Sequence, residues 1–273
     1  MVWDDFVKGR KGIHLRAAHT NGSDAARIYD SVNGFTLELS LDPGSRWVAF
    51  SPCCRDTLPR LVVASTDGGR TKEPLAHQRQ FHSVGGIGWS PNGKQIAFEG
   101  YSGPEGQVKR AIYTIRPSGR GLRHVLDLPL TEDGPASNEA LAWSRNGILY
   151  SDGQDLRIVQ GGTSRLALPR ATSVRISGDG RRIVTVRPVQ GERTLWVGRP
   201  DGSHQRQVAT LTAPPSAPFY SSITPDYGGT HLLAFRLTNE PGDSGSVVIW
   251  TVGESPASAE VLSMHSVAAV TWN

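Results

Sequence analysis

The chain has 273 residues, of which 37% are hydrophobic, and its 29 Lys and Arg against 25 Asp and Glu give a net charge of +4. This length supports a sizeable core, and an all-β chain of this size can form one domain over residues 1–273. The basic residues are spread along the sequence, which argues against a nucleic-acid partner. No stretch approaches the roughly 18 apolar residues of a membrane-spanning helix, so no transmembrane segment is expected.

Predicted strands and tight turns alternate from the N-terminus onward. The clearest hairpin spans residues 82–100, where Val84, Ile87 and Trp89 alternate with small residues, a Pro-Asn-Gly turn follows, and the chain becomes apolar again. In chain order, further copies of this two-strand unit lie at residues 39–50, 138–147, 174–184 and 222–235. The recurrence indicates a repeat protein.

A third strand, a Gly-containing turn and a fourth strand follow the hairpins. Residues 111–116 and 122–126 are the clearest example, and residues 13–17, 61–65 and 195–199 begin similar units. Four strands that recur with a period of roughly 40 to 50 residues are the signature of a β-propeller. We therefore predict an all-β fold, a six-bladed β-propeller with four-stranded blades.

The two ends of the chain complement each other. Complete blades begin near Phe35, Ser83, Asn138, Ala171 and Phe219, whereas the N-terminus supplies strands two to four only. Residues 267–273 supply only a strand one. Pairing the C-terminal strand with the N-terminal strands would close the ring and remove exposed sheet edges.

The repeat resembles that of TolB-like six-bladed propellers. The resemblance rests on Trp-Ser-Pro-Asn-Gly-Lys-x-Ile-Ala-Phe at residues 89–98 and on Ile-Tyr-Thr-Ile-Arg-Pro-Ser-Gly-Arg-Gly-Leu-Arg at residues 112–123. It covers nearly the whole chain and departs from the family's pattern in the short blade at residues 138–169. It implies a propeller that binds partners through one face, outside the cytoplasm if an export signal has been removed.

The N-terminal residues and the cysteines leave the cellular compartment open. The first five residues show no charged-then-apolar leader, so the protein is either cytoplasmic or begins after a removed export signal. Cys53 and Cys54 are adjacent, so they cannot join distant parts of one chain, and they make a poor zinc site. Residues 65–71 resemble a sialidase Asp-box, which is a folding device rather than a catalytic one.

The connections on one face are long and dissimilar, whereas those on the other face are short and alike. Irregular loops on a rigid frame are where binding usually resides, so we expect the ligand site there and at the adjacent channel mouth. The candidate ligand-binding residues are His82, Tyr101, Glu105, Glu139, Phe219, Tyr220, Asp243 and His265. For the two histidines, each of which precedes a first strand, capping of the blade through a backbone hydrogen bond is the alternative.

The sequence favours a non-enzymatic, monomeric binding module over an enzyme. Its partner would be a protein, a peptide or an anionic envelope polymer, and its net positive charge favours anions. The alternative is a metal-dependent lactonase or hydrolase with a site in the central channel. Its ligands would be inward-facing side chains such as Glu38, Asn138 and Glu139. No cofactor is expected for the binding module, whereas the alternative would hold a metal such as calcium.

Overall fold

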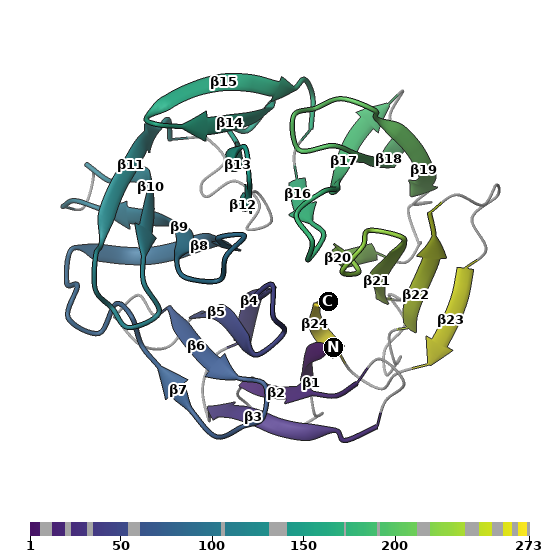
Figure 1. The fold of residues 1–273 in the computed structure, drawn as a ribbon, viewed down its shortest axis with the longest axis horizontal. Coiled ribbons are helices and arrows are strands. Elements are labelled where there is room, and N and C mark those ends of the chain that lie inside the picture. The colour runs from purple at the N-terminus through teal and green to yellow at the C-terminus, as the bar shows by residue number, and fades with distance from the viewer. Residues whose placement is uncertain are drawn as a thin grey trace.

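The computed structural model shows an all-β ring of sheets around a central axis (Figure 1). It describes residues 1–5, 13–19, 23–31, 35–53, 61–104, 107–130, 141–171, 173–189, 192–211, 219–237, 246–252, 259–263 and 267–271. Within these residues there is no helix, and thus none that could cross a membrane. The predicted all-β class and the propeller arrangement are confirmed.

The described strands form six four-stranded antiparallel sheets. One sheet joins the chain ends: β24 (Val267–Thr271), β1 (Val2–Asp5), β2 (Ile13–Ala17) and β3 (Ala26–Ser31). The next consists of β4 (Phe35–Leu41), β5 (Trp47–Cys53), β6 (Val62–Ser65) and β7 (Thr71–Lys72). It is followed by β8 (Phe81–Trp89), β9 (Ile96–Ser102), β10 (Lys109–Ile115) and β11 (Arg123–Leu128).

The remaining three sheets continue around the ring in sequence order. They are β12 (Leu141–Ser144), β13 (Gly147–Ser151), β14 (Leu156–Gln160) and β15 (Thr163–Leu168); then β16 (Ser173–Ile176), β17 (Ile183–Val189), β18 (Glu192–Gly198) and β19 (Arg206–Leu211); and finally β20 (Phe219–Pro225), β21 (His231–Leu237), β22 (Ser246–Thr251) and β23 (Ala259–Ser263). In five sheets the strand that comes first in the sequence is the innermost (Figure 1), and in the sixth β24 takes that place.

A serine and an Asx residue build several of the short turns. In the β8–β9 turn, Ser90 Oγ donates to Asn92 Oδ1 at 2.9 Å and accepts from the backbone N–H of Gln95 at 2.9 Å. Gly93 supplies the positive φ, 66°, that closes this turn. The same bonds recur around Ser177 in the β16–β17 turn, and around Ser65 in the segment that resembles an Asp-box. That segment is thus a structural turn between β6 and β7.

Neighbouring sheets pack closely along their inner strands. Trp89 is 5% exposed and donates from Nε1 to the carbonyl oxygen of Ser40 on β4, at 2.9 Å. On the other side, a Cβ at Gly88 would lie 3.2 Å from the backbone N of Trp143, so β8 and β12 approach almost to backbone contact. Trp89 and Trp143 occupy equivalent repeat positions, and both pack in hydrophobic clusters of the core.

The two ends of the chain meet in one sheet. β24 pairs with β1 in antiparallel register, with Val2 opposite Thr271, Trp3 opposite Val270 and Asp4 opposite Ala269. The Met1 ammonium group also donates to the carbonyl oxygen of Ala18 at 2.8 Å, which holds the start of β1 beside β2. Thus β24 pairs with one edge of β1, while β2 pairs with the other.

Deleting residues 267–273 tests this pairing. The deletion removes one inner strand and its ladder with β1, a loss of several kcal/mol. At about 2–4 °C per kcal/mol, we expect the melting temperature to fall by about 10 °C or more. Differential scanning calorimetry measures the change, and an unaltered melting temperature would contradict the structural role of β24.

Candidate functional site

The central channel is narrow and mainly apolar. Its described cavity measures about 60 Å³ and is lined by the inner strands β4, β8, β12 and β16, together with Thr224 of β20. Leu39, Ile87, Leu141 and Ile176 supply apolar walls, and Arg175 is the one ionisable side chain among the described lining residues. No group of three His, Cys, Asp or Glu side chains that could hold a metal occurs in the described part of the chain.

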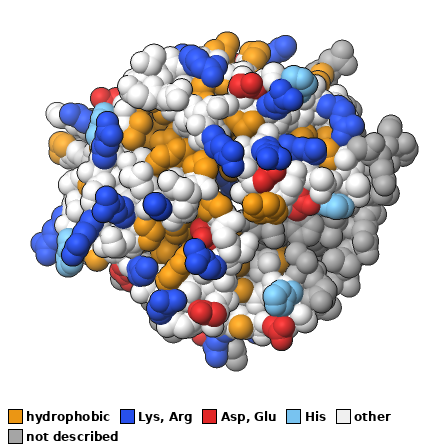
Figure 2. Space-filling view, in the orientation of Figure 1, with side chains coloured by type: hydrophobic (Ala, Val, Ile, Leu, Met, Phe, Trp, Pro, Cys, Tyr) orange, Lys and Arg blue, Asp and Glu red, His pale blue; other side chains and the backbone are white. Residues whose placement is uncertain are grey.

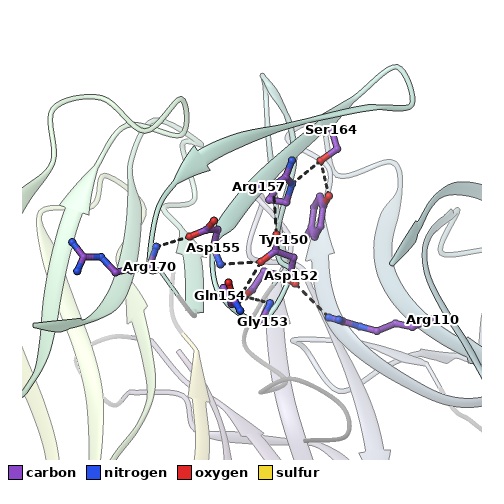
Figure 3. Close-up of polar contacts among 10 residues, drawn as sticks. Arg110, Tyr150, Asp152, Gly153, Gln154, Asp155, Arg157, Ser164 and Arg170 are labelled. Carbon is purple, nitrogen blue, oxygen red and sulfur yellow. Dashed lines mark hydrogen bonds and ion pairs between the residues drawn. The ribbon is translucent and has the colours of Figure 1, made fainter. Parts of the chain in front are cut away.

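On the face with the long connections, which we call the loop face, a polar network surrounds the β13–β14 turn (Figure 3). Asp152 Oδ1 accepts from the backbone N–H groups of Gln154 and Asp155 at 3.1 and 2.9 Å, while Arg157 donates to its Oδ2 at 3.5 Å. Asp155 in turn accepts from the backbone N–H of Arg170 at 2.8 Å. Internal bonds therefore occupy both carboxylates and hold this turn in place.

A buried ion pair lies under the same face, in the β8–β11 sheet. The side chains of Arg110 and Glu99 are 1% and 3% exposed, and the guanidinium group donates to both carboxylate oxygens from Nε and Nη2, at 3.0 Å each. Arg110 also reaches the carbonyl oxygen of Ser151 in the next sheet at 3.5 Å (Figure 3). The pair thus links two neighbouring sheets of the ring.

Tyr101 belongs to this cluster rather than to an exposed loop surface. It is 8% exposed, and its hydroxyl donates to Glu99 Oε2 at 3.4 Å. Burial, reinforced by the negative charge of Glu99, raises the pKa of Tyr101 to about 12, so the phenol stays protonated. Burial also raises the pKa of Glu99, against the opposing effect of Arg110.

The other predicted site residues are distributed as follows. His82 is exposed on β8, and its Nε2 contacts the carbonyl oxygen of Gly103, which directly follows β9 of the same sheet. Phe219 and Tyr220 begin β20, opposite Leu237 and Arg236. Glu105, Glu139, Asp243 and His265 lie outside the described residues. Of the channel candidates, Glu38 lies on β4, and Asn138 is likewise outside the described residues.

Two grooves on the opposite face were not anticipated from the sequence. We call this the short-turn face, because the turns between first and second strands and between third and fourth strands form it. The first groove, of about 620 Å³, lies between the β4–β7 and β8–β11 sheets, and the second, of about 400 Å³, between the β8–β11 and β12–β15 sheets. Gln95 lines both.

Cations surround these grooves. Arg46, Lys72, Lys94 and Arg116 line the first groove, and Arg123 and Arg145 line the second. Figure 2 shows Lys and Arg side chains over much of the visible face, including the part of the ring where Figure 1 places β4 to β11. The residues come from separate repeats, so no single stretch of the sequence shows a basic cluster. The signal available in the sequence was the cation that follows the turn in successive hairpins.

Replacing Arg110 by Met is expected to lower the free energy of unfolding by about 3–5 kcal/mol near neutral pH, because Glu99 is left buried without its cation. With its pKa raised further, Glu99 in the folded variant keeps a proton that the unfolded chain releases above pH 4.5. The free energy of unfolding of the variant therefore falls as the pH rises from the pKa of Glu99 in the unfolded chain to its higher pKa in the folded variant. The difference from the wild type shrinks toward pH 4.5.

Urea unfolding of the wild-type protein and Arg110→Met across this pH range measures the effect. The matched control is Glu99→Leu/Arg110→Met, which removes both charges and should recover most of the lost stability. A deficit below about 1 kcal/mol near neutral pH would show that the ion pair does not stabilise the junction between the sheets.

Comparison with known proteins shows the fold and leaves the activity open. TolB from Acinetobacter baumannii matches with a TM-score of 0.67 and 16% identity over 97% of this chain and 63% of that one. The chain thus spans less than two thirds of the length of that TolB structure. A chain of a nidogen/laminin complex matches with a TM-score of 0.66 and 13% identity, covering 99% of this chain and 96% of that one.

An oligogalacturonate lyase in complex with manganese matches with a TM-score of 0.60 and 10% identity, over 97% of this chain and 78% of that one. No protein-family model matches the sequence, and no curated protein is similar to it. Identities this low carry information about the fold alone. The resemblance to TolB-like propellers is therefore confirmed as a likeness of fold.

Proposed function

We propose that the protein is a non-enzymatic binding propeller that recognises a protein, a peptide or an anionic polymer of the cell envelope. The composition of the channel is the observation that carries this proposal. Its described lining offers apolar side chains, small polar groups and the guanidinium group of Arg175. Hydrolysis or elimination needs a general base or carboxylates that hold a metal, and the described lining contains neither.

The fold is compatible with either kind of activity. A TolB protein and an oligogalacturonate lyase, one of the enzymes among the similar structures, share it. The function must therefore be argued from side chains rather than from the fold. Arg175 favours a binding function, because a guanidinium group cannot ligate a metal ion, whereas it can bind an anionic group of a partner.

We assign partner recognition to the loop face and the channel mouth. The proposed ligand-binding residues are His82, Tyr101, Glu105, Glu139, Phe219, Tyr220, Asp243 and His265. Within this set, Tyr101 would act by supporting the surface from below, since its hydroxyl is committed to Glu99. His82 is exposed at the end of β8 that faces the loops, which leaves its ring accessible beside the Gly103 contact.

The architecture that we propose for this function is one closed domain of six blades, acting as a monomer. The pairing of β24 with β1 supports closure, and the six four-stranded sheets support the blade number. The resemblance to TolB-like propellers supports a location outside the cytoplasm. A rigid closed ring suits a binding module, because it fixes the positions of loops that approach a partner from several blades.

Adding metal ions to the purified protein separates binding from metal-dependent catalysis. After treatment with a chelator, we expect Ca²⁺ or Mn²⁺ at about 5 mM to change the melting temperature by less than about 1 °C, because no resident site gains a ligand. A metal ion present at 100 times its dissociation constant would add about 2.7 kcal/mol to the free energy of unfolding. This corresponds to a rise of several degrees in the melting temperature. Such a rise, together with turnover of a lactone or uronate substrate, would contradict the proposal.

Substitution on the loop face tests where the partner binds. We expect Phe219→Ala/Tyr220→Ala to abolish retention of the partner that the wild-type protein captures from envelope extracts, because aromatic anchors dominate binding energy at interfaces. The control is Asp201→Ala in the β18–β19 turn of the short-turn face, which should leave retention intact. Quantitative mass spectrometry of the captured material gives the comparison, and the reverse pattern would move the site to the other face.

A further inference from the structure

We infer that the two grooves of the short-turn face form a second binding site, which takes an acidic peptide segment of a partner protein that also carries apolar side chains. We call the pair the basic groove, defined by Arg46, Lys72, Lys94, Arg116, Arg123 and Arg145. The inference goes beyond the proposed function, because this surface lies opposite the loop face and needs none of its residues.

The shape of the basic groove suits an extended chain. The volumes of its two parts, about 620 and 400 Å³, lie in the range of pockets that hold ligands. Gln95 lines both parts, so they lie next to each other, on either side of the β8–β9 hairpin. At the far end, an added Cβ at Gly161 or Gly162 would meet no atom within 4 Å, so the second part opens freely to solvent.

The basic groove carries an excess of positive charge, because its described lining holds six Lys and Arg side chains against one carboxylate. Its one carboxylate among the described lining residues, Asp42, accepts backbone N–H groups from Arg46 and Trp47 at 2.6 and 2.7 Å, and from Gly44 at 3.3 Å. No described carboxylate forms an ion pair with Lys94 or Arg116. Several cations around one concave surface raise the local positive potential, which attracts an anionic ligand.

Apolar groups complete the surface. Trp89, Pro117, Trp143 and Ile148 contribute to the floor and walls of the two parts. Pro117 and Trp143 are half-buried, so Leu or Phe side chains of a peptide can bury apolar area against them, while its carboxylates reach the surrounding cations. The amides of Gln95 and Gln160 can pair with the peptide backbone.

The state of the aromatic rings favours a peptide over a nucleic acid or a sugar polymer. Binding of single-stranded nucleic acid relies on free aromatic faces on which bases stack. Here, Lys72 Nζ lies 4.2 Å from the centre of the Trp47 ring, and the Arg70 guanidinium lies over the same ring at 5.2 Å. Trp89 is 5% exposed. Neither the Trp47 ring nor the Trp89 ring therefore offers a free face on which a base could stack.

The test uses a fluorescent decapeptide in which Glu alternates with Leu and Phe, followed by fluorescence anisotropy. We expect the wild-type protein to bind this peptide, with affinity falling as salt is raised to about 150 mM. Lys94→Gln/Arg116→Gln should weaken binding about tenfold or more, because both cations face the groove. Neither side chain is buried, so the melting temperature should stay within about 1 °C of wild type.

Arg181→Gln is the matched control. Arg181 follows Asp179 in the β16–β17 turn as Lys94 follows Asn92 in the β8–β9 turn, and each donates its backbone N–H to the Asx oxygen, at 2.9 and 3.0 Å. It lines neither part of the basic groove. The Arg181→Gln variant should therefore bind within about twofold of wild type, which separates a site from a general effect of net charge.

Three results would overturn the inference. One is equal binding by the groove variant and the wild-type protein. Another is equal binding of a peptide in which Gln replaces every Glu. The third is tighter binding of polygalacturonate or DNA than of the peptide, lost in Lys94→Gln/Arg116→Gln, which would assign the groove to a polymer. Phe219→Ala/Tyr220→Ala should bind the decapeptide normally, so failure of the loop-face proposal and failure of this inference are distinguishable.

Discussion

Close packing of neighbouring sheets along their inner strands is the constraint on which the ring depends. β8 shows it on both sides: Gly88 lets the backbone of β12 approach, and the Trp89 indole bonds to the backbone of β4. A strand held between two neighbours in this way fixes the orientation of its whole sheet, because the outer strands follow the inner one by hydrogen bonding. The narrow channel follows from the same packing, since inner strands this close leave room for only a small apolar cavity.

The turn chemistry explains why much of the fold could be predicted from the sequence. A serine followed two residues later by Asn or Asp recurs at Ser65, Ser90 and Ser177, and each copy makes the same hydrogen bonds. Such turns are local, so their position and spacing show where each strand ends. The pairing of the two chain ends was also predictable, because the repeat leaves one strand over at the C-terminus and lacks one at the N-terminus.

The candidate sites were harder to predict, because they depend on contacts between repeats. Tyr101 follows an apolar strand and precedes a Gly-rich segment, which suggested an exposed loop. In the structure the β8–β9 pairing extends to Ser102, and Tyr101 packs over the ion pair between Glu99 and Arg110, the latter on the next strand. The basic groove likewise joins residues such as Arg46 and Arg116, which only the stacking of sheets brings to one surface.

The short turns also separate two kinds of residue. The oxygens of Asp42, Asn92 and Asp179 are consumed by backbone N–H groups within their own turns, whereas the side chains of the cations beside them take no part in these bonds. The turns thus depend on the identity of these Asp and Asn residues, but not on that of the Lys and Arg residues beside them. In evolutionary terms, the charge of this face can diverge by single substitutions without loss of the ring. One scaffold can thereby present different charged surfaces to different partners.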